Sequence, residues 1–272
     1  MCVLECVVNV SEGRPVPAWD VIVTAAGEHL LDVHRDADHN RSVLTMAGPG
    51  VEDAVRRVAE VAVAALDLRT HTGAHPRIGV LDVVPFVPLV GSTMVDAVAA
   101  RDRFAAWAAP ALGLPCFLYG PERTLPEVRA GAFSALSPDT GPSQPHPSAG
   151  ASAVGARPLL VAYNLWLAGS DLAEARVLAS GLRSRSVRAL GLQVGDSVRV
   201  SMNLVAPNEV GPAAVYDAIA PKAAITRAEL VGLLPAAVLA EVPSSRWAEL
   251  DLAADRTIEA RLAAKGWGSA GI

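Results

Sequence analysis

Hydrophobic and polar positions along the chain predict the same order of elements twice. In the first half, the pattern predicts strand, helix, strand, strand, helix and strand at residues 3–10, 17–26, 29–33, 41–46, 51–66 and 78–87. In the second half, it predicts that order again at residues 158–167, 171–185, 187–194, 198–205, 211–220 and 224–230. The order β-α-β-β-α-β is typical of a split-βαβ, ferredoxin-like unit. We therefore predict an α+β fold of two ferredoxin-like subdomains, with mixed or antiparallel sheets covered by helices.

The segments outside this repeat indicate where the two halves join. A long helix is expected at residues 93–112, and a final amphipathic helix at 245–265. Residues 134–155 are rich in serine, proline, glycine and alanine and show almost no periodicity, which predicts a long functional loop at the join. We accordingly divide the chain into an N-terminal subdomain at 1–157 and a C-terminal subdomain at 158–272.

Composition and charge exclude several classes of partner. A formal net charge of −5 without a concentrated basic run argues against nucleic-acid binding. The chain has no apolar run long enough to cross a bilayer, and its start lacks the basic and then apolar pattern of a secretory signal. We expect a cytoplasmic protein with no membrane contact. Its three cysteines, at positions 2, 6 and 116, favour free thiols over a disulfide framework.

Residues 69–88 concentrate candidate chemistry in front of an apolar run. Pro76 disfavours α conformation at His75, so His75 and Arg77 are expected in an extended turn before a buried strand. An imidazole there is suited to acid/base chemistry, although a loop histidine bonded to a neighbouring carbonyl is about as common. His71 and His75 are four residues apart, but they lack a continuous helix and the glutamate of H-E-x-x-H. We predict no metal site.

Two further polar segments each have two interpretations. The sequence D-A-D-H-N at 36–40 contains metal-ligand types, but Asp and Asn are also what a hairpin turn requires, so we predict the turn. Gly141 and Gly150 would either expose backbone N–H groups to an anionic or heteroaromatic ligand or belong to a flexible linker. These patterns indicate a two-subdomain α+β enzyme with a histidine site near a polar loop, and they do not identify its substrate.

Several motifs are familiar in sequence and in order. They are V-N-V-S-E-G at 8–13, D-H-N-R-S-V at 38–43, G-A-H-P-R-I-G-V-L-D-V-V-P-F-V-P at 73–88, L-Y-G at 118–120, R-A-G at 129–131, G-A-R at 155–157, Y-N at 163–164, V-S-M-N-L at 200–204 and L-V-G-L-L-P at 230–235. Together they resemble the formimidoyltransferase domain of glutamate formimidoyltransferases, over nearly residues 1–242. The resemblance implies two α/β subdomains, a homodimer, and transfer of a formimidoyl group between N-formimidoyl-L-glutamate and tetrahydrofolate. It also implies a place in one-carbon metabolism and histidine catabolism, with tetrahydrofolate as co-substrate.

The resemblance further implies roles for particular residues. His75 is expected to be the catalytic acid/base, which accepts a proton from the attacking nitrogen and returns it to the leaving one. Arg41 or Arg77 would clamp a substrate carboxylate, and Asp82 or Asp36 would stabilise the cationic amidinium. The residues expected to bind the amino-acid substrate are Asn9, Asn40, Arg41, Arg77, Asp82, Tyr119, Asn164 and Asn203. Those expected to bind the folate are Gly141, Pro142, Ser143, Gln144, Pro147, Ser148 and Gly150.

Departures from the family pattern define the alternatives. His34 stands where relatives often carry a carboxylate, and Ala149 lies near the position of a typical tryptophan, so the loop offers less stacking surface to a pterin. The alternative function is a paralogue that transfers formimidoyl or formyl between other small amines with weakened folate dependence. A non-catalytic binding protein is disfavoured by the group His75-Pro76-Arg77. Because the sequence ends at Ile272, no cyclodeaminase domain is expected to follow.

Overall fold

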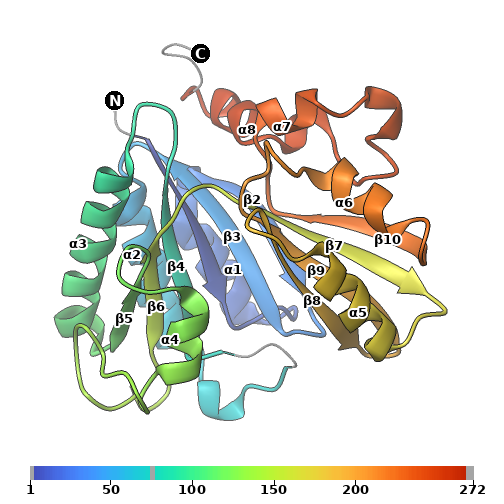
Figure 1. Ribbon diagram of the computed structural model, residues 1–272. Helices are drawn as coiled ribbons and strands as arrows, with labels where there is room; N and C mark the ends of the chain where they lie inside the picture. Colours follow the sequence, from blue (N-terminus) through green and yellow to red (C-terminus); the bar gives the residue numbers. More distant parts are fainter. Residues whose placement is uncertain (1–2, 74–76, 268–272) are drawn as a thin grey trace. The chain divides into compact units, whose positions relative to one another are not determined.

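The computed structural model describes residues 3–73 and 77–267, which divide between two compact units, Met1–Pro158 and Leu159–Ile272. Each unit combines a sheet with helices, as Figure 1 shows. The α+β class predicted from the sequence is therefore confirmed. The two units are described separately below.

The first unit is built on a mixed sheet. Its strands are β1 (Leu4–Val10), β2 (Leu30–Asp36), β3 (Arg41–Gly48), β4 (Leu81–Pro88), β5 (Cys116–Tyr119) and β6 (Ser152–Ala156). Its helices are α1 (Pro17–Ala26), α2 (Val51–Ala65), α3 (Met94–Leu112) and α4 (Leu125–Gly131), with 3₁₀ turns η1 (Gly27–His29) and η2 (Leu68–Thr70). The strand order is β2-β3-β1-β4-β6-β5, and β6 runs parallel to both of its neighbours while the other pairs are antiparallel.

The second unit is built on an antiparallel sheet. Its strands are β7 (Val161–Ala168), β8 (Val187–Val194), β9 (Ser197–Leu204) and β10 (Ala224–Val231), in the order β10-β7-β9-β8. Its helices are α5 (Leu172–Leu182), α6 (Pro212–Ile219), α7 (Ala236–Ala240) and α8 (Ile258–Ala264), with 3₁₀ turns η3 (Ser244–Arg246) and η4 (Ala254–Arg256). The order fourth, first, third, second also describes β4-β1-β3-β2 in the first unit. Each unit thus contains the predicted split-βαβ arrangement, which the first unit extends by β5 and β6.

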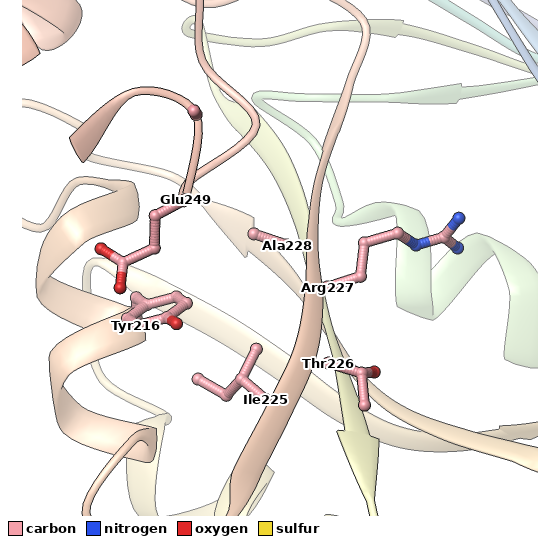
Figure 2. Close-up of a pocket in the computed structure, with 7 residues that line it drawn as sticks. Tyr216, Ile225, Thr226, Arg227, Ala228 and Glu249 are labelled. Carbon is pink, nitrogen blue, oxygen red and sulfur yellow. The ribbon is translucent and has the colours of Figure 1, made fainter. Parts of the chain in front are cut away.

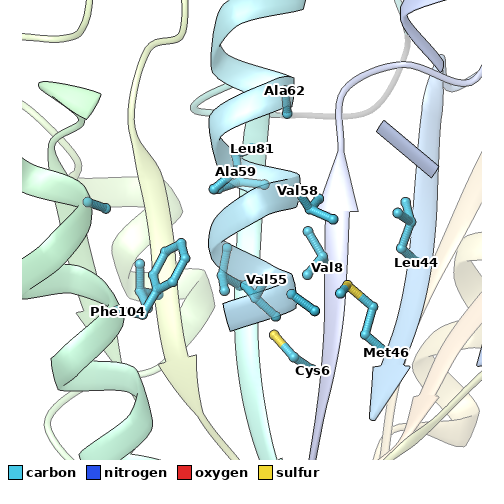
Figure 3. Packing of buried hydrophobic residues seen from close by; sticks show 14 of the residues in the cluster. Cys6, Val8, Leu44, Met46, Val55, Val58, Ala59, Ala62, Leu81 and Phe104 are labelled. Carbon is cyan, nitrogen blue, oxygen red and sulfur yellow. The ribbon is translucent and has the colours of Figure 1, made fainter. Parts of the chain in front are cut away.

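The core of the first unit lies between its sheet and its helices. In Figure 3, Val55 and Val58 of α2 lie over Cys6 and Val8 of β1, and all four are fully buried. Burial of each such side chain contributes roughly 1.5–3 kcal/mol relative to leaving it in water. Burial raises the pKa of the Cys6 thiol well above its ordinary value, which keeps the sulfur neutral. Cys6 is therefore a packing residue, and its thiol is free, as expected.

Local capping explains where the helices begin. Thr93 and Asp96 form a reciprocal capping box at the start of α3, and Asp171 and Glu174 form another at the start of α5. Gly113 ends α3 in a left-handed conformation with φ of 61°.

Of the helices in residues 3–73 and 77–267, none combines the length and apolarity needed to cross a membrane.

Three sequence-based assignments differ from the structure. The predicted loop at 134–155 contains the start of β6, whose small residues gain their strand pairing from burial between β4 and β5 rather than from propensity. The predicted helix at 245–265 is helical mainly in α8, because Asp251 adopts a left-handed φ of 54° and accepts a hydrogen bond from the N–H of Leu230. Helix α4 was not predicted, although Thr124 begins a capping box ahead of it.

Gly79 allows the polar loop to approach the segment that precedes β4. The N–H of Val80 donates to the carbonyl of Ala149 at 3.0 Å, and the N–H of Ala151 donates to the carbonyl of Ile78 at 2.9 Å. A Cβ at Gly79 would overlap the carbonyl oxygen of Ala151. Glycine at this position therefore lets two segments that are far apart in the sequence bond directly through their backbones.

Candidate functional site

Several segments with polar side chains meet at one end of the first sheet. The register places Val10, at the end of β1, opposite Ser42 at the start of β3 and Leu81 at the start of β4. The β2–β3 hairpin closes at the same end, where Asp36 pairs with Arg41. The turn after β1, the β2–β3 turn and the segment before β4 are consequently neighbours in space. The motifs at 118–120 and 155–157 lie toward the other end of the sheet, since β5 and β6 run parallel to β4.

Asn40 joins two of these segments. It has a left-handed φ of 47°, a conformation that asparagine tolerates better than most residues, and its side chain is buried. Its Oδ1 accepts from the N–H of Gly13 at 2.8 Å, and its Nδ2 donates to the carbonyl of Thr72 at 3.0 Å. The side chain therefore ties the turn after β1 to the residues just ahead of position 74.

Arg77 is bonded to the same hairpin turn from the other side of residues 74–76. Its Nη2 donates to the carbonyl of His39 at 2.9 Å, and its Nη1 donates to the carbonyl of Asn40 at 3.1 Å. Nη1 also lies 2.5 Å from Nε2 of His71. The same Nε2 lies 3.0 Å from the carbonyl oxygen of Asn40, so it faces one donor and one acceptor, and its role is set by the tautomer of the ring.

The environment of His71 favours its neutral form. Burial lowers the pKa of His71 below its ordinary value of 6.5, and the positive charge of Arg77 lowers it further, against an opposing effect of the Asn40 carbonyl. Protonation would place an imidazolium N–H against the Arg77 guanidinium. These contacts hold the His71 ring against Asn40 and Arg77.

We expect the stability of the chain to fall at acidic pH partly through His71. Because its pKa is lower in the folded state than in the unfolded one, the unfolded state binds more protons below about pH 6.5. The contribution of His71 to the free energy of unfolding is fully present above that pH, and it is lost as the pH falls through the folded-state pKa of His71. Urea unfolding at neutral and at mildly acidic pH measures the loss, which should be smaller in His71→Gln than in the parent. An equal loss in both proteins would contradict the assignment.

Asp82 is a buried carboxylate in the same region. It is fully buried, its Oδ2 accepts from Nη2 of Arg129 at 2.6 Å, and its Oδ1 accepts from the N–H of Ile78 at 2.8 Å. The Arg129 side chain comes from α4 and is 23 % exposed. The pair therefore fixes the backbone directly after Arg77 and connects it to α4.

Asp36 and His39 form a second carboxylate-containing pair within the β2–β3 turn. Oδ2 of Asp36 lies 2.7 Å from Nδ1 of His39, and Oδ1 accepts from the N–H groups of Asp38 and His39. The predicted hairpin turn is confirmed. Within the ranges that the structure describes, no group of three or more His, Cys, Asp or Glu side chains is placed to hold a metal ion.

The end of the loop at 141–150 is anchored by His146. Its Nδ1 accepts from the N–H of Ala149 at 2.9 Å, and its own backbone pairs with that of Gly150. The carbonyl of Ser148 accepts from the N–H of Leu68 at 2.7 Å. The residues proposed for folate in the first part of the loop, Gly141, Pro142, Ser143 and Gln144, are exposed, as is Pro147.

The remaining predicted residues belong to other elements or fall outside the described ranges. His75 falls in the segment that the structure does not describe. Asn9 bonds the carbonyl of Val7 through its side chain at 3.0 Å. Tyr119 is buried against Gly155, and burial raises the pKa of its hydroxyl to about 12. Asn164 and Asn203 belong to β7 and β9 of the second unit, where Asn164 donates to Glu229 at 2.8 Å.

Sequence reasoning gave no role to Arg129 or to the pairing of His39 with Asp36. Arg129 lies in the motif R-A-G, whose partner Asp82 is 47 residues away, so no local pattern connects them. The Asp36 pairing is more readily found, because an aspartate three residues before a histidine in a tight turn can reach its ring.

Comparison with known proteins identifies the class. The profile of the family "Formiminotransferase domain, N-terminal subdomain" matches residues 3–157. The chain is 33% identical to the glutamate formimidoyltransferase of Streptococcus pyogenes serotype M1, over 88% of the chain and 91% of that protein. It is 32% identical to the glutamate formimidoyltransferase of Thermoplasma acidophilum, over 89% of the chain and 91% of that protein. The chain belongs to the formiminotransferase family.

A longer relative matches over part of its length. The formimidoyltransferase-cyclodeaminase of Sus scrofa is 33% identical over 85% of the chain, which spans 50% of the pig protein. The similarity therefore falls on a portion of that protein, while it covers most of the streptococcal and archaeal ones.

Proposed function

We propose that the chain is an enzyme that transfers a formimidoyl group between N-formimidoyl-L-glutamate and tetrahydrofolate. The observation that carries the proposal is the similarity to the streptococcal glutamate formimidoyltransferase, which extends over 91% of that protein. Tetrahydrofolate acts as a co-substrate. A cytoplasmic homodimer, expected from the family resemblance and the composition, is part of the same proposal.

The proposed chemistry needs a group that moves protons at neutral pH. An amine nitrogen of one substrate attacks the amidine carbon, a C–N bond forms, and the tetrahedral adduct then breaks its other C–N bond. The attacking nitrogen must lose a proton, and the leaving nitrogen must gain one. An imidazole with an ordinary pKa near ~6.5 can do both, and we assign this role to His75.

The flanks of His75 support this assignment. Thr72, before it, is bonded to Asn40, and Arg77, after it, donates to the carbonyls of His39 and Asn40. Both flanks are thus held on one hairpin turn. Such anchoring suits a catalytic group, because the reacting atoms must be held in a narrow range of positions.

The contacts also divide the substrate roles among the candidate charges. Both terminal nitrogens of Arg77 donate to main-chain carbonyls, so we assign the clamp on a substrate carboxylate to Arg41. Stabilisation of the amidinium stays assigned to Asp82 or Asp36, since Asp82 pairs with Arg129 and Asp36 pairs with His39. Asn9, Asn40, Tyr119, Asn164 and Asn203 remain proposed substrate contacts, and residues 141–150 remain the proposed folate loop.

The composition of the folate loop favours a second candidate function. Between Gly141 and Gly150 the only ring that could stack on a pterin is that of His146, whose Nδ1 is occupied by backbone N–H groups. A paralogue that transfers formimidoyl or formyl between other small amines would need less stacking surface.

Incubation of the purified chain with both substrates tests the proposal. We expect 5-formimidoyltetrahydrofolate to form, and free glutamate to appear in equal amount. The matched reaction replaces tetrahydrofolate by a small amine acceptor. Glutamate release only with the small amine would favour the paralogue, and no release with either acceptor from folded protein would reject formimidoyl transfer.

A further inference from the structure

Strands of the second unit bring Arg227, Trp166 and Arg199 into one row. The register places Trp166 of β7 opposite Arg227 of β10 on one side and opposite Arg199 of β9 on the other. The β7–β10 register shifts between Ile225 and Arg227, which makes Thr226 the extra residue of a β-bulge. Bulges re-aim side chains and are frequent next to functional sites. This bulge sets Arg227 beside the indole.

Both guanidinium groups stack on the Trp166 ring. The Cζ atoms of Arg199 and Arg227 lie 4.7 Å and 4.6 Å from its centroid, within the range of a cation–π contact. Glu229 accepts from the indole N–H of Trp166 at 3.0 Å and from the Asn164 amide at 2.8 Å. Its carboxylate oxygens lie 3.5 Å and 3.7 Å from the two guanidinium groups. The network holds these side chains in a defined arrangement.

The row lies on the sheet face opposite the helices of the unit. Leu165 and Val200, whose side chains alternate with those of Trp166 and Arg199, pack into the core with α5 and α6. A pocket of about 310 Å³ near α6 is lined by residues that include Tyr216 and Glu249. Figure 2 shows the Arg227 side chain extending from β10 away from those two residues. Arg227 therefore belongs both to the stacked row and to the lining of that pocket, with its guanidinium directed away from Tyr216 and Glu249.

We propose that Arg227, stacked on Trp166 beside Arg199, anchors a binding site for the carboxylate group of a small-molecule acid. The Arg227 side chain is 59% exposed, so a ligand can reach it. A guanidinium that lies over an aromatic ring still carries N–H donors along the edge of its own plane. A carboxylate matches that edge with two parallel hydrogen bonds.

Charge supports an anionic ligand. Arg199 and Arg227 contribute two positive charges to the row, and Glu229 contributes one negative charge. The stacked arginine has also already lost part of its rotamer freedom, so less is lost when a ligand binds. An acid is therefore favoured over a neutral or cationic ligand at this position.

The Trp166 indole N–H provides a direct reporter. The full chain, labelled with ¹⁵N, has five tryptophans, and Trp166→Phe assigns the indole resonance of Trp166. We expect L-glutamate, added at constant ionic strength, to shift this resonance in a saturable manner, and neutral glutaramide to leave it unchanged. Arg227→Gln should weaken L-glutamate binding about tenfold or more, because a charge-assisted bidentate contact is lost.

Arg176→Gln is the matched control, since it removes the same charge from an exposed position on α5 of the same unit. We expect its affinity for L-glutamate to stay within about twofold of the parent. The proposal is overturned if L-glutamate gives no saturable shift, if the two variants bind equally, or if inorganic phosphate displaces L-glutamate at lower concentration. The choice of L-glutamate rests on the proposed function, but the readout needs no turnover. Binding without formimidoyl transfer would reject only that function, and transfer without binding would reject only this site.

Discussion

Replacement of His75 by glutamine is expected to lower kcat for formimidoyl transfer by about 10²–10⁴-fold, the usual contribution of a positioned general acid/base. Glutamine can still hydrogen-bond to a substrate nitrogen, but it cannot take a proton from one nitrogen and return it to another. The KM values should change little, because the proposed substrate contacts of Arg41 and Asn40 remain. Steady-state kinetics with both substrates, together with the pH dependence of kcat, measures the effect.

The control is His29→Gln, which removes an imidazole elsewhere in the first unit. Nε2 of His29 lies 2.8 Å from the carbonyl of Pro49, and a glutamine amide can donate to the same oxygen. We expect this variant to keep the parent rate and pH profile. A His75→Gln protein that is folded and transfers the group at a similar rate would remove the acid/base role from His75.

Replacement of Asp82 by asparagine is expected to lower the free energy of unfolding by about 3 kcal/mol, near the lower end for breaking a buried ion pair. One carboxylate oxygen would become an NH₂ group facing the N–H donors of Arg129, within 2.6 Å in the parent. The lower end applies because the Arg129 side chain is 23 % exposed and can turn toward water. Urea unfolding measures the change.

Glu52→Gln is the isosteric control on an ion pair nearer to solvent. Glu52 pairs with Arg103, whose side chain is 55% exposed. Loss of this ion pair should lower the free energy of unfolding by at most about 1 kcal/mol. This figure includes the loss of a negative charge from the first turn of α2. If Asp82→Asn and Glu52→Gln lower the free energy of unfolding equally, burial of Asp82 does not increase the contribution of its ion pair to stability. We also expect transfer to slow in Asp82→Asn, since Asp82 holds the backbone N–H of Ile78 just after Arg77.

The two sheets could be predicted from the sequence because their strands and helices have strong local periodicity. Strand β6 was missed because Ser152–Ala156 carries small residues, and its pairing depends on β4 and β5, which lie far away in the chain. The last helix was overextended, since its pattern does not reveal that Asp251 turns left-handed to bind Leu230. Such tertiary contacts override local preference.

The candidate site shows the same division. The turn at 36–40 follows from composition, but the partners of the charges in residues 36–40 and 69–88 do not. Arg77 was expected to face substrate, whereas its terminal nitrogens bond the carbonyls of His39 and Asn40. Arg129 received no role because only the folded chain brings it to Asp82.

The double hydrogen bond of Asn40 limits how position 40 can vary during evolution. A left-handed φ of 47° favours asparagine, aspartate and glycine over other residues. Aspartate could accept from Gly13 but not donate to Thr72, and glycine could do neither. Of these three residues, only asparagine adopts the left-handed conformation and makes both hydrogen bonds. We therefore expect nearly every amino-acid substitution at position 40 to be selected against.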